Sequence, residues 1–263
     1  MLNRIFHDQL QLGLAQSVAA AMAAMLVVLL ARRRAIHLES EALLAMVRGL
    51  VQIVAVGSVL LLLLRAPRWA SIFLLLAMIV AAGATSAKRA KNVPGAFRVS
   101  AWSIAMGAGS VIAVMTALGV IDTAITALVP VGSMLIANAM NTNGLALNRF
   151  RGDVLAHVGE IETALALGAD AKISVAPYVQ ASFEASLIPA IDSLRSLGIV
   201  WIPGLMAGML LSGARPVYAA IYQFVVLAMI FAASGLTSLA STFMIPSQVF
   251  TAADQLLLQP GRK

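Results

Sequence analysis

The chain lacks cysteine and carries little charge and few aromatic side chains. Its 263 residues include no Cys, and only 11% are Asp, Glu, Lys or Arg, whereas 61% are apolar. Without cysteine, the chain can form neither a disulfide framework nor a thiolate metal site. Soluble domains carry about a quarter charged residues, so this composition excludes a soluble globular protein. The sequence therefore predicts an integral membrane protein.

Several catalytic and nucleotide-binding motifs are also missing. The chain has no Gly-x-x-x-x-Gly-Lys-Ser/Thr loop for a nucleotide phosphate, no His-Glu-x-x-His and no Gly-x-Ser-x-Gly. No acid, base or nucleophile gathers within the apolar segments. We therefore expect no enzymatic activity, no assigned metal site and no cofactor in this chain. The net charge of +7 comes from cations spread over several loops, which argues against nucleic acid as a partner.

Long apolar segments predict an all-α fold, a polytopic bundle of transmembrane helices in one domain, residues 1–263. Helices are expected because hydrocarbon offers no partner to backbone N–H and C=O groups, and about 20 apolar residues cross the bilayer. Seven spans are predicted, at residues 10–31, 43–64, 69–87, 99–120, 123–140, 188–211 and 217–240. The fifth contains Pro130 and Gly132 and the sixth begins with polar residues, so six or eight crossings remain open.

The distribution of Lys and Arg predicts the orientation, because cytoplasmic loops are enriched in both. With the amino terminus outside, the inner segments carry Arg32, Arg33, Arg34, Lys88, Arg89, Lys91, Arg98, Arg149, Arg151, Lys172, Arg262 and Lys263. The outer segments carry only Arg4, Arg65, Arg68 and Arg215. We therefore expect the amino terminus outside and the carboxyl terminus in the cytoplasm.

A polar interruption at residues 158–172 separates the fifth and sixth apolar segments. It reads Val-Gly-Glu-Ile-Glu-Thr-Ala-Leu-Ala-Leu-Gly-Ala-Asp-Ala-Lys. Glu160 and Glu162 suit the positive end of a helix dipole, and Gly168 provides a turn that ends the helix. The pattern predicts a short cytoplasmic helix at the membrane surface, where it can dock a soluble motor.

The same interruption resembles a transporter signature. Glu162-Thr163-Ala164, followed after three residues by Gly168, is similar to the Glu-Ala-Ala…Gly pattern of ABC transporter permeases, whose short coupling helix sits in a cleft of the ATP-binding subunit. An Ala-rich surface helix that ends at glycine is the other interpretation. The resemblance implies a coupling segment at about residues 145–175, with candidate coupling residues Arg149, Arg151, Glu160, Glu162, Ala164 and Gly168.

Two longer stretches resemble the FetB family of ABC permeases. Residues 187–198, Leu-Ile-Pro-Ala-Ile-Asp-Ser-Leu-Arg-Ser-Leu-Gly, continue into Ile-Pro-Gly-Leu-Met-Ala-Gly at 202–208, and the Asn-rich segment 131–149 is similar to the end of a span in that family. The likeness implies a homodimer in the bacterial inner membrane with FetA-like subunits that bind ATP and Mg. The family is linked to iron export, and plant relatives to aluminium tolerance and nucleotide sugars.

Charged and polar residues within the apolar segments are candidates for a substrate pathway. Arg48 and Gln52 lie one helical turn apart and share a face, which should point toward protein or water. Alternatively, Arg48 snorkels to the membrane surface. Asp192 and Arg195, three residues apart, line the pathway or form a surface pair.

Three asparagines complete the candidate pathway. Their amide oxygens, with nearby methionine sulfurs, could bind a metal ion in passage, although this mixture names no metal. Asparagine at a helix end more often caps it or bonds a neighbouring helix. These residues are Asn138, Asn141 and Asn143.

Proline and glycine in the sixth segment predict a broken or kinked helix at Pro189, Pro203 and Gly204. The hypothesis is an ABC permease subunit that exports iron or a related metal through a cavity near Gln52, Asn138, Asn141 and Asp192. One alternative changes the cargo to a nucleotide sugar or another small organic molecule. The other is a membrane scaffold or regulator, which predicts no ATPase partner.

Overall fold

The computed structural model describes residues 9–32, 39–63, 67, 69–90, 93–251 and 253–258. Within these ranges the ordered elements are helices, with two isolated β-bridges, so the predicted all-α class is confirmed. Among them, five helices are long and apolar enough to span a membrane, and Ala42–Ser58 is a shorter apolar stretch. The chain divides into two units, Met1–Ala66 and Pro67–Lys263.

The first unit consists of two apolar helices that contact each other, α2 (Gln9–Arg32) and α3 (Glu39–Leu63). Most of their described side chains are exposed, including Val27, Leu44 and Val54. Helices that are apolar on all sides need an apolar surrounding, which lipid provides. The span predicted at residues 10–31 is confirmed by α2.

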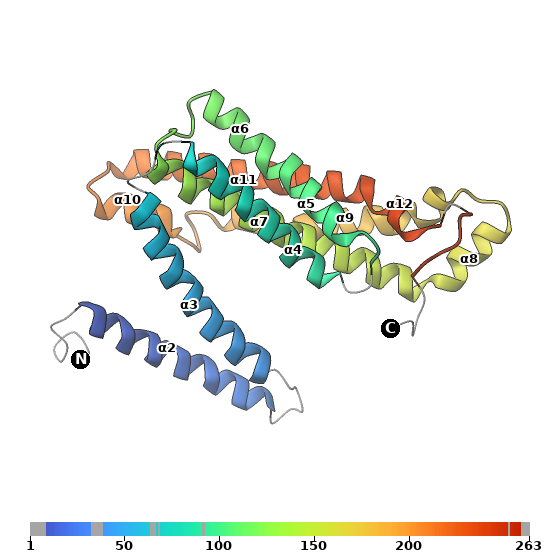
Figure 1. Cartoon of the computed structure of the whole chain (residues 1–263), viewed down its shortest axis with the longest axis horizontal. Helices are drawn as coiled ribbons and strands as arrows, with labels where there is room; N and C mark the ends of the chain where they lie inside the picture. The colour runs from blue at the N-terminus through green and yellow to red at the C-terminus, as the bar shows by residue number, and fades with distance from the viewer. Residues whose placement is uncertain are drawn as a thin grey trace. The chain divides into compact units, whose positions relative to one another are not determined.

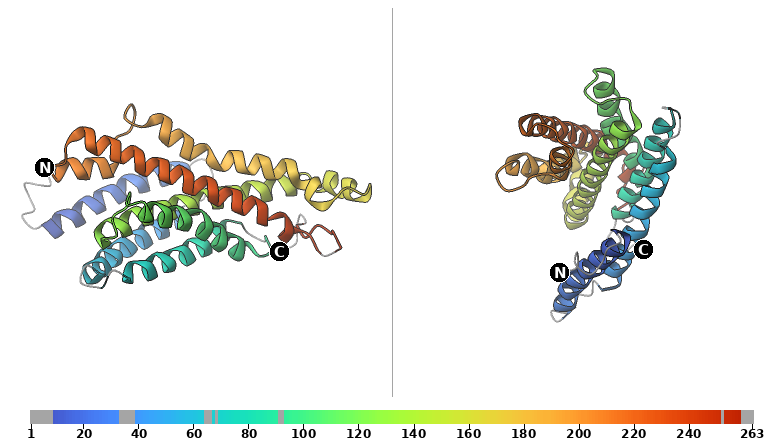
Figure 2. Two further views of the ribbon diagram at one scale, coloured as in Figure 1. Left: turned by 90° about the horizontal axis from the view of Figure 1, so that it is seen from above. Right: turned by 90° about the vertical axis from the view of Figure 1, so that its left-hand side faces the viewer.

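The second unit is a bundle of long helices, and the views in Figures 1 and 2 show them side by side. They are α4 (Ala70–Arg89), a continuous rod of α5 (Ala96–Ile104), η1 (Ala105–Gly109) and α6 (Ser110–Ala117), then α7 (Ile125–Ala156), α9 (Ala171–Ser196) and α11 (Pro216–Met244). The helices α8 (Val158–Ala166) and α12 (Pro246–Val249) lie at one end of this bundle, and α10 (Gly204–Leu211) lies at the other (Figure 1). We call the former the α8 end.

The helix α7 is longer than a membrane span. Its 32 residues extend about 48 Å, against about 30 Å of hydrocarbon. Since its last turns carry Arg149, Arg151 and Asp153, the α8 end projects beyond the bilayer. The helix therefore continues beyond residue 140, the predicted end of the fifth span. The Asn-rich segment continues the helix, because the side chain of Asn143 forms tertiary hydrogen bonds with Ser86 and Ser100.

The predicted sixth span, residues 188–211, is divided between two helices, with a break at Pro203 and Gly204, two of the three positions where the sequence favours one. The helix α9 begins at Ala171, well before the predicted start, because Asp170 caps it. It continues past Pro189 and ends at Ser196. Residues 197–203 then break the chain, and α10 begins at Gly204 after Pro203.

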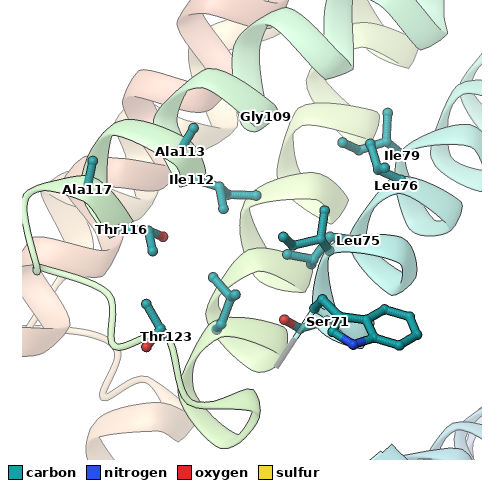
Figure 3. Close-up of a pocket in the computed structure, with 13 residues that line it drawn as sticks. Ser71, Leu75, Leu76, Ile79, Gly109, Ile112, Ala113, Thr116, Ala117 and Thr123 are labelled. Atoms are coloured by element: carbon teal, nitrogen blue, oxygen red, sulfur yellow. The ribbon is translucent and has the colours of Figure 1, made fainter. Parts of the chain in front are cut away.

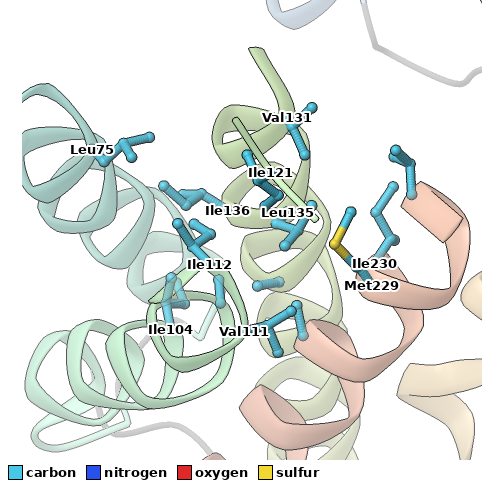
Figure 4. Close-up of a cluster of buried hydrophobic side chains, with 14 of the residues drawn as sticks. Leu75, Ile104, Val111, Ile112, Ile121, Val131, Leu135, Ile136, Met229 and Ile230 are labelled. Atoms are coloured by element: carbon cyan, nitrogen blue, oxygen red, sulfur yellow. The ribbon is translucent and has the colours of Figure 1, made fainter. Parts of the chain in front are cut away.

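Two apolar clusters fill the second unit. The first core joins α4, α5, η1, α6, α7 and α11 through residues such as Ile104, Leu135 and Met229, several of which point toward one another in Figure 4. The α8-end core joins the ends of these helices with α8, α9 and the C-terminal segment through residues such as Phe150 and Ile161. Both cores lie in one bundle, but their surfaces differ.

Candidate coupling site and polar layer

The helix α8 ends in a pair of backbone hydrogen bonds typical of a Schellman motif. Gly168 N donates to Leu165 O over 2.9 Å, and Ala169 N donates to Ala164 O over 3.0 Å. Gly168 has a φ of 89°, in the left-handed region that favours glycine. Asp170 then caps α9, because its Oδ1 accepts a 2.7 Å hydrogen bond from the N–H two residues later. The chain therefore reverses sharply between α8 and α9.

One buried side chain anchors α8 to the bundle. Ile161 is 1% exposed and belongs to the α8-end core with Phe150, Val154 and Val175. Such a residue contacts many neighbours, so the position of α8 depends on that of α7 and α9. The predicted short helix is thus a rigidly held element.

A second contact between α8 and α9 is aromatic and polar. The rings of His157 and Tyr178 stack with centroids 5.0 Å apart. The Tyr178 hydroxyl donates to Glu160 Oε2 over 3.3 Å. Burial raises the pKa of Tyr178, and the neighbouring Glu160 carboxylate raises it further, so the phenol keeps its proton and remains a donor.

The outward surface of this end carries exposed apolar side chains next to charges. Leu167 is 84% exposed and Ile173 is 68% exposed, and Glu162 is exposed on α8. A pocket of about 450 Å³ lies between α8 and a C-terminal turn. Its lining consists of Glu162, Leu165, Thr251, Asp254, Gln255, Leu256 and Leu257. No local pattern predicts that this turn packs on α8, because the contact joins segments far apart in the chain.

The other predicted coupling residues make contacts within the chain. Arg149 Nε forms a 2.9 Å ion pair with Asp153 Oδ2. The side chain of Arg151 is partly buried, and its Nε has no hydrogen-bond partner among the described residues. Ala164 is half-buried. The exposed part of the predicted set is therefore Arg149, Glu160, Glu162 and Gly168.

The predicted pathway residues are not gathered in one place within the second unit. Asn138 is exposed and donates to a carbonyl of its own helix, and Asn141 Oδ1 accepts from Arg89 Nη1 over 3.2 Å. Asp192 and Arg195 form an exposed pair 3.8 Å apart, near the end of α9. This pair is the surface interaction that the spacing allowed.

Arg48 and Gln52 belong to the first unit. Both side chains are exposed on α3, one turn apart. Among the described residues, no hydrogen bond or ion pair of either side chain is found. Their role in a pathway stays a prediction.

Asn143 alone of the three asparagines lies in the interior. It is 0% exposed, and its Nδ2 donates to Ser86 Oγ over 2.7 Å and to Ser100 Oγ over 2.9 Å. These bonds join α7 to α4 and α5. A buried amide needs such partners, since an unpaired polar group in an apolar surrounding costs about 1–3 kcal/mol.

Asn143 is part of a buried layer of hydroxyl and amide side chains that separates the two cores. We call it the polar layer. Along α4 it follows Ala82 of the first core and precedes Ala90 of the α8-end core, and along α11 it lies between Ala233 and Ile245. Five helices contribute Ser86, Ser100, Ser103, Thr142, Asn143, Ser182, Ser186, Ser234, Thr237, Ser238, Ser241 and Thr242. The part of the polar layer on α11 could have been found from the sequence, because its Ser and Thr residues recur at intervals of three and four residues.

A separate pocket of about 800 Å³ lies between α4, α6 and the start of α7. In Figure 3 its wall is formed mainly by aliphatic side chains such as Leu75, Ile79 and Ile112, with hydroxyls at Ser71, Thr116 and Thr123. This lining suits hydrocarbon better than an ion.

Comparison with known proteins identifies the family. Residues 14–250 match the model of the uncharacterised protein family UPF0014. The chain belongs to this family. It is 34% identical over 252 residues to the rice UPF0014 membrane protein STAR2, covering 95% of this chain and 88% of that protein. No solved structure matches the chain.

Two further UPF0014 relatives bear names that describe a role. The chain is 31% identical over 248 residues to the probable iron export permease protein FetB of Escherichia coli K12, covering 92% of this chain and 95% of that protein. It is 31% identical over 245 residues to the protein ALUMINUM SENSITIVE 3 of Arabidopsis thaliana, covering 93% and 90%. The predicted resemblance to the FetB family is confirmed, and the protein is a membrane protein.

Proposed function

We propose that this UPF0014 protein is the membrane-spanning permease subunit of an ABC transporter that exports iron or a related metal species. ATP and Mg bind to a separate, FetA-like subunit. The observation that carries the proposal is the construction of α8 and the turn into α9. Ile161 anchors α8 inside, whereas Glu162 on α8, Leu167 after it and Ile173 at the start of α9 are exposed. Similarity to FetB supports the cargo and the direction.

In this proposal, α8 transmits force in both directions. It is short and is joined by tight turns to the long helices α7 and α9, so a push on α8 moves both. Leu167 and Ile173 supply apolar contact with the partner's cleft, and Glu162 supplies a charge. The break at residues 197–203 lets α9 tilt relative to α10.

The proposed assembly is a homodimer of this chain with two ATP-binding subunits in a bacterial inner membrane. The α8 end faces the cytoplasm, because the ATP-binding subunits are there. This places the amino terminus outside and the carboxyl terminus inside, as the Lys and Arg distribution predicts.

A nucleotide sugar or another small organic cargo is the second candidate. It is favoured by the hydroxyl and amide groups of the polar layer, which suit a hydrogen-bonding solute. Stimulation of the complex's ATPase activity by metal would count against it. A scaffold or regulator without transport predicts that no ATP-binding subunit is bound.

The first test is a pull-down of the tagged chain from its native membrane in mild detergent, with mass spectrometry of what stays bound. We expect a stoichiometric ATP-binding subunit. Its repeated absence from intact, folded protein would overturn the proposal in favour of the scaffold.

Charge reversal on α8 tests the coupling role. Glu162→Lys should leave insertion and melting temperature unchanged but uncouple ATP hydrolysis from transport, because Glu162 is exposed and its side chain forms no hydrogen bond or ion pair with another described residue. Asp122→Lys is the charge reversal before α7, at the opposite end of the bundle. It also removes the 2.9 Å hydrogen bond that Asp122 Oδ1 accepts from Ala124 N, but it should keep coupling. Unchanged transport in Glu162→Lys would contradict the assignment of α8.

A further inference from the structure

Four hydroxyls of the polar layer make no hydrogen bond with any described residue. They are Ser103 of α5 and Ser234, Thr237 and Ser241 of α11, and each residue is at least 99% buried. Buried polar groups in folded proteins nearly always have partners, so four orphans in one layer require an explanation.

Helix geometry does not cause this lack of partners. Other hydroxyls of the polar layer donate to carbonyls of their own helix, as Ser182 does to Val179 O over 2.7 Å and Thr242 does to Ser238 O over 2.9 Å. This local bond is the usual solution for Ser and Thr inside a helix. The four orphans instead leave their hydrogen-bonding capacity unused.

The orphans lie at the contact between α11 and the rod that contains η1. A Cβ added to Gly107 of η1 would overlap Thr237 Oγ1 and lie 2.5 Å from Thr237 N, so the two backbones are in close approach here. Ser103 precedes Gly107 by one turn, and Ser234 and Ser241 flank Thr237 at helical spacing. The π-helical turn η1 is an independent sign, because such turns are frequent at functional sites.

The same layer connects with the α8 end. Along every long helix of the bundle it adjoins the α8-end core, and the Ser186 and Ser238 hydroxyls meet at 2.7 Å between α9 and α11. A motion of α8 that tilts α9 therefore acts on the polar layer directly. The contact between η1 and α11 is the part of the layer where the four unpartnered hydroxyls lie.

We propose that the contact between η1 and α11 is the binding site for the cargo on the α8 side of the membrane, closed in this structure. This inference rests on the proposed function and extends it to the cargo's chemistry. The orphan hydroxyls and the unpaired Oδ1 of Asn143 are neutral groups, and they hold a solute with an outer shell of hydrogen-bonding oxygens. The water shell of a hydrated metal ion and the hydroxyls of a sugar both present that chemistry.

The absence of cysteine from the chain allows a direct test of opening. Single-cysteine variants Ser103→Cys and Ser241→Cys, in the complex with its ATP-binding subunit, are treated with a charged, membrane-impermeant methanethiosulfonate. We expect labelling that changes at least tenfold between the ATP-bound and nucleotide-free states. Ser247→Cys, at an exposed position in α12, is the positive control. No labelling of either buried cysteine in any state, with Ser247→Cys labelled, overturns the proposal.

Removal of one orphan hydroxyl separates a binding role from a structural one. Thr237→Val keeps the shape of the side chain, so the melting temperature should stay the same or rise, whereas ATP-driven transport should fall about tenfold. Thr85→Val, on the exposed face of α4, removes a hydroxyl that bonds to Ala81 O and should leave transport unchanged. Normal transport in Thr237→Val would contradict the proposal.

Uptake of Fe²⁺ and of UDP-glucose is measured in inside-out vesicles. The two probes distinguish a hydrated metal ion from a sugar as the cargo. Loss of Fe²⁺ uptake in Thr237→Val supports a hydrated ion, and loss of UDP-glucose uptake supports an organic cargo. If the wild-type chain binds no ATP-binding subunit and takes up neither probe, the proposed function fails. If it transports while the buried cysteines stay unlabelled, only the present inference fails.

Discussion

The two cores of the second unit are both apolar, yet they are surrounded by different surfaces. Around the first core the outward side chains are large and apolar, as at Phe73, Trp102 and Phe224. Around the α8-end core polar and charged side chains are more frequent, and the exposed apolar side chains include Phe97, Leu167, Ile173 and Phe243. Exposed apolar residues suit lipid in the first region. In the second they mark a protein contact, because a surface in water seldom exposes them next to each other.

The polar layer is what separates these regions. It lies where α7 leaves the hydrocarbon, and it holds hydrogen bonds between helices on the α4 and α9 sides. On the α11 side it leaves hydroxyls unpaired. Hydrogen bonds thus connect the helices along one part of the layer, whereas hydroxyls along the rest lack partners among the described residues. We expect such a contact between helices to open on the side without hydrogen bonds.

The largest effect should come from the anchor of α8. Ile161→Ala removes a fully buried side chain from the α8-end core and should lower the free energy of unfolding by about 2–5 kcal/mol. Leu167→Ala is the matched truncation of an exposed side chain and should change stability by less than about 0.5 kcal/mol. Thermal unfolding in detergent measures both, and pull-down of the ATP-binding subunit should weaken in each. Equal melting temperatures of the two variants would contradict the assignment of Ile161 as an anchor and Leu167 as a docking residue.

An intermediate effect is expected where η1 approaches α11. Gly107→Ala places a methyl group against the backbone of Thr237, so one helix must shift, at a cost of about 1–3 kcal/mol. Gly109→Ala, whose added Cβ would lie 3.9 Å from Ile79 Cδ1, should be neutral or slightly stabilising. If the two variants have the same melting temperature, the contact between η1 and α11 is looser than the structure indicates.

Local pattern was sufficient for some elements and insufficient for others. Charge-free length predicted α2 and α4, and the acidic turn with Gly168 predicted α8, because these depend on neighbours in sequence. The continuation of α7 through its asparagines depends on Ser86 and Ser100, more than forty residues away. The C-terminal turn that packs on α8 is likewise a distant contact. The hydroxyls of α11 recur at helical spacing in the sequence but were not among the predicted residues, and only the structure shows which of them lack partners among the described residues.

The smallest effect concerns the turn that ends α8. Gly168 has a φ of 89° and an added Cβ would meet nothing within 4 Å, so Gly168→Ala costs only backbone strain, about 1 kcal/mol. Gly159→Ala, inside α8 and equally open, should instead stabilise the helix by roughly the same amount. Both leave the exposed surface of α8 almost unchanged. If Gly168→Ala nevertheless uncouples ATP hydrolysis from transport while Gly159→Ala does not, the sharp reversal between α8 and α9 transmits the force, and the charge at Glu162 serves only for docking.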